Sequence, residues 1–194
     1  EITNLSRGKL ADWRAANPDV APATELLNRI RQERRQKWEQ SELAKYEGKG
    51  NQPPKDWKDR YKEPEPVQPD EIGGLPNLPE LWCWAASEEI VEPETDIVYG
   101  IVQPGRHLKE GIPYVRGKDI VDGNILVDQL LKTSEQIAAK YERASLKGGD
   151  ILLGIIRATK VAIVPDELTG GNITQGTARF RPSSIIRTKF LAGW

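Results

Sequence analysis

The polar side chains of this 194-residue chain that could do chemistry are of the types that bind ligands rather than transform them. Two β-like runs, Gly111–Ile120 and Asn172–Pro182, carry Arg, Lys, Asn, Thr and Gln. Arg and Lys bind phosphates and guanine edges, and Asn and Gln can pair with adenine edges, so these types indicate nucleic-acid recognition. The candidate DNA-binding residues are Arg106, His107, Lys109, Tyr114, Arg116, Lys118, Arg157, Thr159, Lys160, Asn172, Thr174 and Gln175.

The sequence lacks the groups that common catalytic and cofactor sites require. Its one histidine, His107, and its one cysteine, Cys83, are too few for a Ser–His triad or a zinc site. Neither the phosphate-binding Gly-x-x-x-x-Gly-Lys-Ser/Thr motif nor Gly-x-Gly-x-x-Gly is present. Asp19 with Glu47–Lys49 formally matches a metal-dependent nuclease, but a helix between them would separate the acids by about 40 Å. We therefore expect no catalysis, no metal and no cofactor.

Charge is unevenly distributed along the chain, although the formal net charge is only −1. Residues 71–96 carry seven acids and no Lys or Arg, whereas residues 97–194 carry fourteen Lys and Arg against nine Asp and Glu. A mildly basic C-terminal region is compatible with a nucleic-acid-binding face, because distribution matters more than the sum.

The sequence also bears on the compartment. No apolar run approaches the roughly 20 residues needed to span a bilayer, so we expect no membrane association. The first residues, Glu1–Lys9, lack the features of a signal peptide, and the single Cys83 cannot form an internal disulfide. We expect a cytoplasmic protein.

The overall pattern predicts an α+β fold in three zones, of which the first, residues 1–47, is helical. Pro22 suits the first turn of a helix, and Gly48 and Gly50 are expected to end it. A narrow apolar stripe in an otherwise charged helix is typical of a coiled-coil seam or a partner-docking face. The candidate partner-docking residues are Leu26, Leu27, Ile30, Arg34 and Trp38.

Residues 48–77 are expected to form an extended linker. Prolines recur through this stretch and just beyond it, and their density is expected to exclude helix and sheet. Trp57 and Tyr61 are the residues that could pin the linker to a neighbouring element. The prolines are Pro53, Pro54, Pro64, Pro66, Pro69, Pro76 and Pro79.

Residues 78–194 form a strand-rich zone. Residues 82–90 are expected to start as a strand and turn into a short helix, and 133–143 to form a helix capped near Ser134. Gly148–Gly149 and Gly170–Gly171 are expected to make hairpin turns. Apolar, β-branched runs predict strands over 96–103, 114–116, 150–156, 160–164 and 173–181.

Three polar residues of this zone have predicted roles inside the fold. Asp119 is expected to accept hydrogen bonds in a turn. Arg179 and Arg181 alternate with Ala178 and Phe180, so we expect the arginines on a solvated strand face and the apolar residues in the core.

Several motifs resemble those of a known family when they are taken together. Four of them occur in order: Gly111–Ile120, Gly148–Leu153, Val161–Pro165 and Asn172–Gln175. This arrangement resembles a target recognition domain of the specificity (S) subunit of type I restriction–modification enzymes. Leu78–Trp84 resembles the approach to such a domain. Ser6–Leu10 and Pro22–Arg34 resemble the conserved segment between two such domains.

The resemblance implies a non-catalytic subunit that reads DNA. In that family each of two recognition domains reads one half of a split site through the major groove. Conserved helices form an antiparallel coiled coil that spaces the domains and docks methyltransferase (M) subunits, while a separate restriction (R) subunit cleaves. For this chain it implies that residues 1–47 are the tail of the spacer. Residues 78–194 would be one mixed α/β recognition domain with a twisted sheet, incomplete at its C-terminus. The implied partners are double-stranded DNA, M subunits and, through the complex, the R subunit.

One departure and two alternatives stay open. Many relatives carry an Arg-Gly-Thr-like turn where this chain has Gly154–Lys160, which leaves the roles of Arg157 and Lys160 open. The chain could instead be the recognition region of a fused restriction–methylation enzyme, which methyltransferase motifs upstream in the reading frame would reveal. It could also be a protein-interaction module without DNA binding, whose partner binding would survive deletion of residues 78–194.

Overall fold

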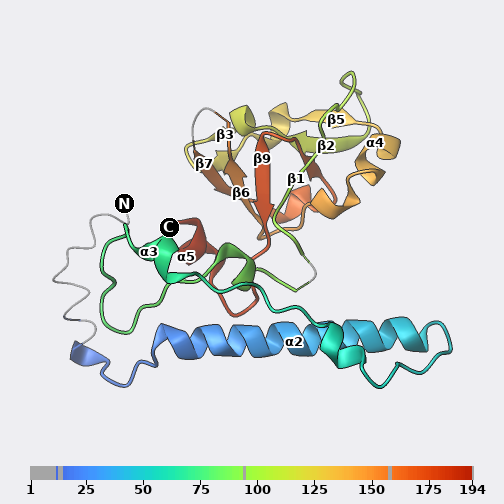
Figure 1. Cartoon of the computed structure of the whole chain (residues 1–194). Coiled ribbons are helices and arrows are strands. Elements are labelled where there is room, and N and C mark those ends of the chain that lie inside the picture. Colours follow the sequence, from blue (N-terminus) through green and yellow to red (C-terminus); the bar gives the residue numbers. More distant parts are fainter. Residues whose placement is uncertain (1–11, 13–14, 94, 157–158, 194) are drawn as a thin grey trace. The chain divides into compact units, whose positions relative to one another are not determined.

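The computed structural model describes residues 12, 15–93, 95–156 and 159–193. The chain forms two compact units, the first ending at Glu89 and the second beginning at Ile90, and each is described by itself. The sequence placed the corresponding boundary at residue 78. The predicted mixture of helices and sheets is present (Figure 1). Among the described residues, no helix is both long and apolar enough to cross a membrane.

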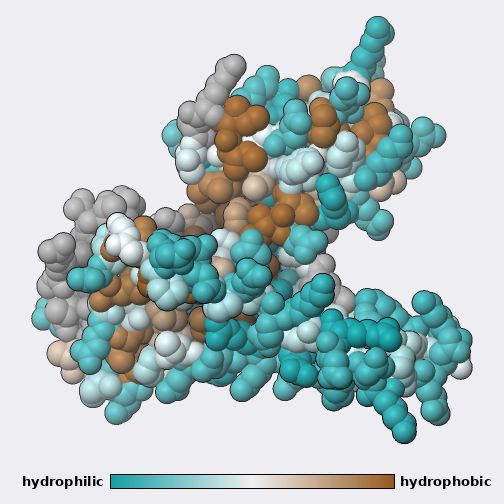
Figure 2. All heavy atoms as spheres, viewed as in Figure 1, coloured by the Kyte–Doolittle hydropathy of each residue, from teal (hydrophilic) through white to brown (hydrophobic). Residues whose placement is uncertain are grey.

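One long helix, α2 (Ala23–Glu47), dominates the first unit. It begins directly after Pro22, whose φ of −56° suits a helix start, and the free Ala23 N–H donates to Leu81 O at 2.8 Å. It ends at Gly48, whose N–H donates to Ala44 O at 2.9 Å. The predicted helix and both of its ends are therefore confirmed, whereas its role in a coiled coil stays a prediction. Figure 2 shows that the visible face of α2 is mostly hydrophilic.

The proline-rich segment after α2 turns back along that helix (Figure 1). The prediction that its prolines exclude helix is wrong in two places, the 3-10 helix η2 (Trp57–Arg60) and the short α3 (Pro69–Ile72). Pro69 is tolerated because it occupies the first helical turn, where no backbone donor is needed. The prediction that Trp57 and Tyr61 pin this segment to a neighbour is confirmed, because both rings lie against Trp38 of α2.

The first unit closes with the 3-10 helix η3 (Ser87–Glu89), which lies against α2. Residues 82–86 do not form the strand expected there, and only the short helix is present. Glu89 is buried, and its carboxylate accepts hydrogen bonds from Arg31 Nε at 2.9 Å and from the Ala86 N–H at 2.9 Å. This ion pair fastens the end of the unit to the helix.

The second unit contains a four-stranded antiparallel sheet with strand order β1-β9-β6-β7. At its centre Leu152 lies opposite both Ala162 and Arg179. The strands predicted over 150–156 and 160–164 are confirmed, and that over 96–103 is reduced to two residues plus a bridge at Ile101. The bounds are β1 (Val98–Tyr99), β6 (Ile151–Gly154), β7 (Lys160–Ile163) and β9 (Thr177–Phe180).

A three-stranded sheet of order β5-β2-β8 brings the two polar-tipped runs of the sequence together. Strands β2 (Ile112–Val115) and β8 (Asn172–Ile173) pair in parallel, with Tyr114 opposite Asn172. Strand β5 (Leu131–Thr133), which the sequence did not predict, pairs with β2 on the other side.

The predicted glycine pairs do not make hairpin turns. Gly148–Gly149 and Gly170–Gly171 do form turns, with Gly149 and Gly170 at φ values of 86° and 88°, but each follows a 3-10 helix rather than joining two paired strands. A two-residue hairpin instead joins β3 (Ile120–Val121) to β4 (Asn124–Ile125). Its central residues Asp122 and Gly123 both have positive φ, as this kind of hairpin turn requires.

The core of the second unit includes Val115, Leu146, Leu152 and Ile173, drawn from both sheets and the segment before β6. The predicted cap is confirmed, because Ser134 Oγ accepts from the Ile137 N–H at 3.3 Å. The helix it starts, α4 (Glu135–Ala139), is shorter than predicted, since Thr133 belongs to β5 and the 3-10 helix η6 (Glu142–Ala144) follows. A last helix, α5, spans Thr188–Ala192.

The single strand expected over 173–181 is two strands, and the phase of the second is the reverse of the prediction. The bridge residue Thr174 and a turn over 175–176 separate β8 from β9. In β9 the buried residues are Thr177 and Arg179, at 0% and 2% exposure, while Ala178 and Phe180 are half-buried. The solvated arginine face is therefore a wrong prediction, because the alternation places Arg179 inward.

Candidate nucleic-acid interface

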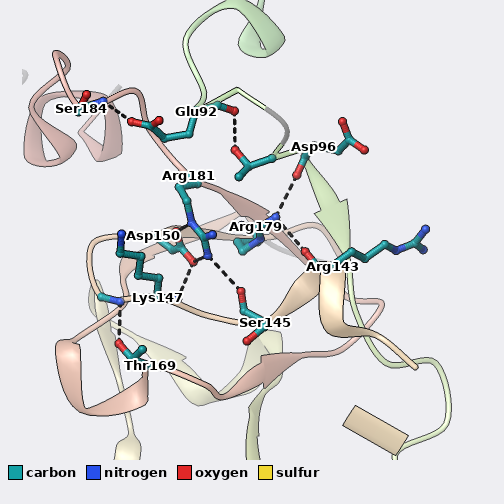
Figure 3. Close-up of polar contacts among 12 residues, drawn as sticks. Glu92, Asp96, Arg143, Ser145, Lys147, Asp150, Thr169, Arg179, Arg181 and Ser184 are labelled. Atoms are coloured by element: carbon teal, nitrogen blue, oxygen red, sulfur yellow. Dashed lines mark hydrogen bonds and ion pairs between the residues drawn. The ribbon is translucent and has the colours of Figure 1, made fainter. Parts of the chain in front are cut away.

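Two arginines of the sequence's second polar run belong to a network of hydrogen bonds and ion pairs inside the second unit (Figure 3). Arg179 Nη2 donates to Asp96 O at 3.2 Å and to Arg143 O at 3.0 Å, so one guanidinium joins three segments. Arg181 donates to the buried carboxylate of Asp150, with Nε to Oδ1 at 2.7 Å. Both side chains thus bind groups of the chain itself, and only Arg181 stays partly exposed, at 25%.

The protonation of the two guanidiniums reflects their surroundings. Burial, and then the positive charge of Arg181, hold the pKa of Arg179 below the ordinary arginine value. Hydrogen bonding to Asp150 raises the pKa of Arg181 above it. Asp150 thus compensates one of the two charges, and the Arg179 guanidinium relies on backbone carbonyl dipoles.

Arg116, a candidate DNA-binding residue, is held by its neighbour Asp119. Its Nε and Nη2 donate to the two carboxylate oxygens at 2.7 Å each, and its backbone N–H donates to Oδ2 at 2.9 Å. The predicted turn-capping role of Asp119 is confirmed, at the 3-10 helix η4 (Gly117–Asp119). This hydrogen bonding raises the pKa of the Arg116 guanidinium, whose side chain is 23% exposed.

Two of the candidate residues are buried. Tyr114 and Asn172 are each 2% exposed. Asn172 uses its side chain internally: Nδ2 donates to Tyr141 O at 3.1 Å, and Oδ1 accepts from the Ile173 N–H at 2.8 Å. Neither side chain is presented at the surface of the described chain, so their contact with DNA stays a prediction.

Three loops converge at one end of the second unit. The Ile155 N–H, after β6, donates to Gly176 O at 3.0 Å, and the Gln175 N–H donates to Ile101 O at 3.1 Å. The Gly176 carbonyl is also close to η4, because a methyl group added to Gly117 would lie 3.7 Å from it. We call the exposed residues of these loops the tip. They are Lys118, Ile155, Ile156, Thr159 and Gln175.

The remaining candidates near the tip are more enclosed. Lys160 is half-buried, and its Nζ donates to Ile120 O at 2.9 Å. Thr174 is half-buried as well, and its backbone N–H donates to Val115 O at 3.1 Å. Arg157 lies outside the described residues. Ile155 and Ile156 were missed by the sequence-based set, although two apolar residues after the end of a strand are a readable signal.

A second exposed group lies on the loop between β1 and β2, where Arg106, His107 and Lys109 are all exposed. This loop is tied to β5. His107 Nδ1 accepts from the Lys132 N–H at 3.1 Å, and Thr133 Oγ1 donates to Pro104 O at 2.6 Å. The predicted residues therefore form two groups, one held by β5 and one held by β6, β8 and η4.

The predicted docking stripe on α2 is largely covered by the chain itself. Leu27 and Ile30 are buried, and Leu26 is half-buried. Trp38 stacks on Trp57, with ring centroids 5.9 Å apart, and on Tyr61 at 5.3 Å. The last stripe residue, Arg34, is half-buried. Burial, and then the charge of Glu63, raise the pKa of the Tyr61 phenol, while the positive charge of Arg34 lowers it by less.

No group of three or more His, Cys, Asp or Glu side chains in the described part of the chain could hold a metal ion.

Comparison with known proteins adds a sequence likeness. No family model matches the chain. The type I restriction enzyme EcoBI specificity subunit of Escherichia coli is 34% identical over 119 residues, which cover 60% of this chain. The matched stretch is only 25% of that protein, so the chain spans about a quarter of the curated relative.

Two solved structures also resemble the chain. The HsdS subunit from Thermoanaerobacter tengcongensis is 22% identical with a TM-score of 0.42, over 61% of this chain and 28% of that one. A chain from a structure of the assembly and conformational transition of the type I R-M system is 18% identical with a TM-score of 0.45, over 87% of this chain and 36% of that one. Likenesses this distant support no residue-level argument. Over the stretch of 34% identity, however, the chain is similar to the specificity subunit of a type I restriction enzyme.

Proposed function

We propose that this chain recognises a DNA sequence as part of the specificity subunit of a type I restriction–modification complex, and that it catalyses no reaction itself. The observation that carries the proposal is the 34% identity to a curated specificity subunit. In this role the second unit reads one half of a bipartite site in double-stranded DNA. The methylation and cleavage reactions belong to other subunits.

The exposed chemistry of the second unit supports DNA reading. Lys118 at the tip and Arg106 and Lys109 on the loop tied to β5 are exposed cations, suited to phosphates or guanine edges. Gln175 at the tip is exposed as well, and its side-chain amide can pair with adenine. The nearest acid in sequence to Lys118, Asp119, is neutralised by Arg116 and does not repel a phosphate.

For the partner contact, we propose that the first unit docks a methyltransferase subunit and, through the complex, associates with the restriction subunit. The covered stripe moves the expected docking area away from Trp38, which the chain's own Trp57 already stacks on. The half-buried Leu26 and the exposed charged residues of α2, such as Arg29, remain available to a partner.

The test is a selection from randomised duplexes, using the full chain together with its methyltransferase partner. We expect one enriched motif and an affinity that falls steeply with salt, because cations released from DNA drive the binding. Replacing one phosphate-binding cation is expected to reduce the salt slope by about 1. Equal affinity for all duplex sequences would contradict the proposal.

Single variants assign the effect to the candidate surface. Lys118→Ala and Arg106→Ala are expected to weaken binding, and Lys189→Ala, an exposed cation on α5, serves as the charge-matched control. If all three variants lose affinity equally, the proposed surface is wrong even where the chain binds DNA.

A further inference from the structure

The tip carries two adjacent apolar side chains that no element of the described chain covers. Ile155 and Ile156 are 53% and 59% exposed, and Ile156 is the most exposed large apolar side chain among the described residues. Isoleucine gains free energy by leaving water, so an adjacent exposed pair indicates a surface that meets a partner. Figure 2 shows apolar residues at the surface of the second unit, over the end where Figure 1 places β3, β6 and β7.

Local packing holds Ile156 close to the tip's amide-bearing turn. A methyl group added to Gly176 would lie 3.1 Å from Ile156 Cδ1 and 3.6 Å from Cγ1, so the isoleucine rests against this glycine. Gln175 is the preceding residue and is exposed. The Ile155 N–H bond to Gly176 O joins the same two loops through their backbones. Ile156 thus lies against the residue that follows Gln175, and both Ile156 and Gln175 are exposed.

This combination matches one kind of base pair. In the major groove an A·T pair shows the adenine N7 acceptor and N6 donor, which an amide can pair with, and the thymine C5-methyl, which is apolar. A G·C pair has no methyl group to offer. Lys118 supplies a cation at the same tip, so the surroundings of the isoleucines favour a polyanion over an apolar protein surface.

We infer that Ile156, with Ile155 beside it, contacts a thymine methyl group in the recognised site, while Gln175 faces an adenine. The inference rests on the proposed function, because it names which base pair that reading surface selects. It makes these isoleucines specificity-determining residues, and it predicts that the recognised half-site contains at least one A·T pair.

The test compares thymine with deoxyuridine, which lacks only the methyl group. In the motif selected by the full chain with its methyltransferase partner, each thymine is replaced in turn by deoxyuridine. At the one thymine whose methyl group Ile156 contacts, we expect the affinity of the wild-type chain for the duplex to fall about fourfold. This is the amount that one buried methyl-sized group contributes. Ile156→Ala is expected to bind the two duplexes equally, and Ile156→Val to keep the preference for thymine.

The control and the contrary outcomes are separate from those of the proposed function. Phe190→Ala removes an apolar side chain of similar exposure, 55%, from α5 and is expected to leave the thymine preference intact. An identical thymine-to-deoxyuridine ratio in wild type and Ile156→Ala overturns the inference, as does a motif without an A·T pair. In both cases an enriched motif leaves the proposed function standing, whereas the absence of any motif removes both.

Discussion

Asp150 and Arg181 form a two-point ion pair that joins the residue before β6 to the residue after β9. Arg181 Nε lies 2.7 Å from Oδ1 and Nη2 lies 2.9 Å from Oδ2. Asp150 is 1% exposed, and the Lys147 N–H donates to the same carboxylate at 2.8 Å. The buried carboxylate is tolerated because these donors satisfy it. The ion pair links the start of β6 to the end of β9, its neighbour in the sheet.

Replacing the acid of this pair is expected to destabilise the second unit. In Asp150→Asn the Arg181 guanidinium loses its charged acceptor, and removing one partner of a buried pair costs about 3 kcal/mol. Urea unfolding followed by far-ultraviolet circular dichroism measures the loss, and amide exchange in β6 and β9 locates it. The control is Glu39→Gln on α2, whose exposed pairs with Arg35 and Lys58 contribute little. Equal stability of Asp150→Asn and wild type would contradict the buried role.

Replacement by alanine is expected to destabilise the chain at Gly100 but not at Gly74. A Cβ at Gly100 would lie 2.0 Å from Ile173 O, so Gly100→Ala must push apart the segments joined by the Ile101 N–H bond to that oxygen. We expect a loss of about 1–3 kcal/mol, typical of overpacking. Gly74 has no atom within 4 Å of its Cβ position, so Gly74→Ala is the matched control. Thermal unfolding compares them, and faster exchange of the Gln175 amide in Gly100→Ala tests whether the tip is disturbed.

Trp57 is expected to stabilise the first unit by covering Trp38. Trp57→Ala removes a ring that is 9% exposed and is stacked 5.9 Å from its partner, so we expect a loss of about 3 kcal/mol. Fluorescence of the remaining tryptophans should shift towards longer wavelength and become easier to quench. Trp82→Ala, at a position that is 36% exposed, is the control. If the two variants unfold at the same urea concentration, the stacking contributes nothing measurable.

Tyr114 is expected to make the second unit sensitive to alkali. Burial raises the pKa of its phenol above the ordinary value of 10.0, against a smaller lowering by Arg116. The folded state therefore holds the proton more tightly, and stability present below pH 10 is lost as pH rises towards the folded pKa. Tyr114→Phe cannot titrate, so its stability should fall less steeply over this range. Unfolding measured across an alkaline pH series, beside the phenolate absorbance of each protein, gives the comparison; parallel curves would refute it.

Features that depend only on residues close together in the sequence could be predicted from the sequence alone. Pro22 and Gly48 mark the ends of α2 because a missing donor and a small residue act locally, whatever packs nearby. The Ser134 cap and the Asp119 turn follow from side chains reaching a backbone group three residues away. The likeness to a specificity subunit was also visible in residue types and their order.

Tertiary structure decided which side of each short strand faces inward. An alternating strand offers two faces, and its pattern alone did not reveal that β9 turns Arg179 inward and leaves Phe180 half-buried. The reason is that Arg179 Nη2 donates to the carbonyls of Asp96 and Arg143, which lie 83 and 36 positions away in the chain. The tip likewise exists only because loops after β6, β8 and β2 meet. Such long-range partners have no local signal, so only the folded chain brings Ile156 against Gly176, the residue after Gln175.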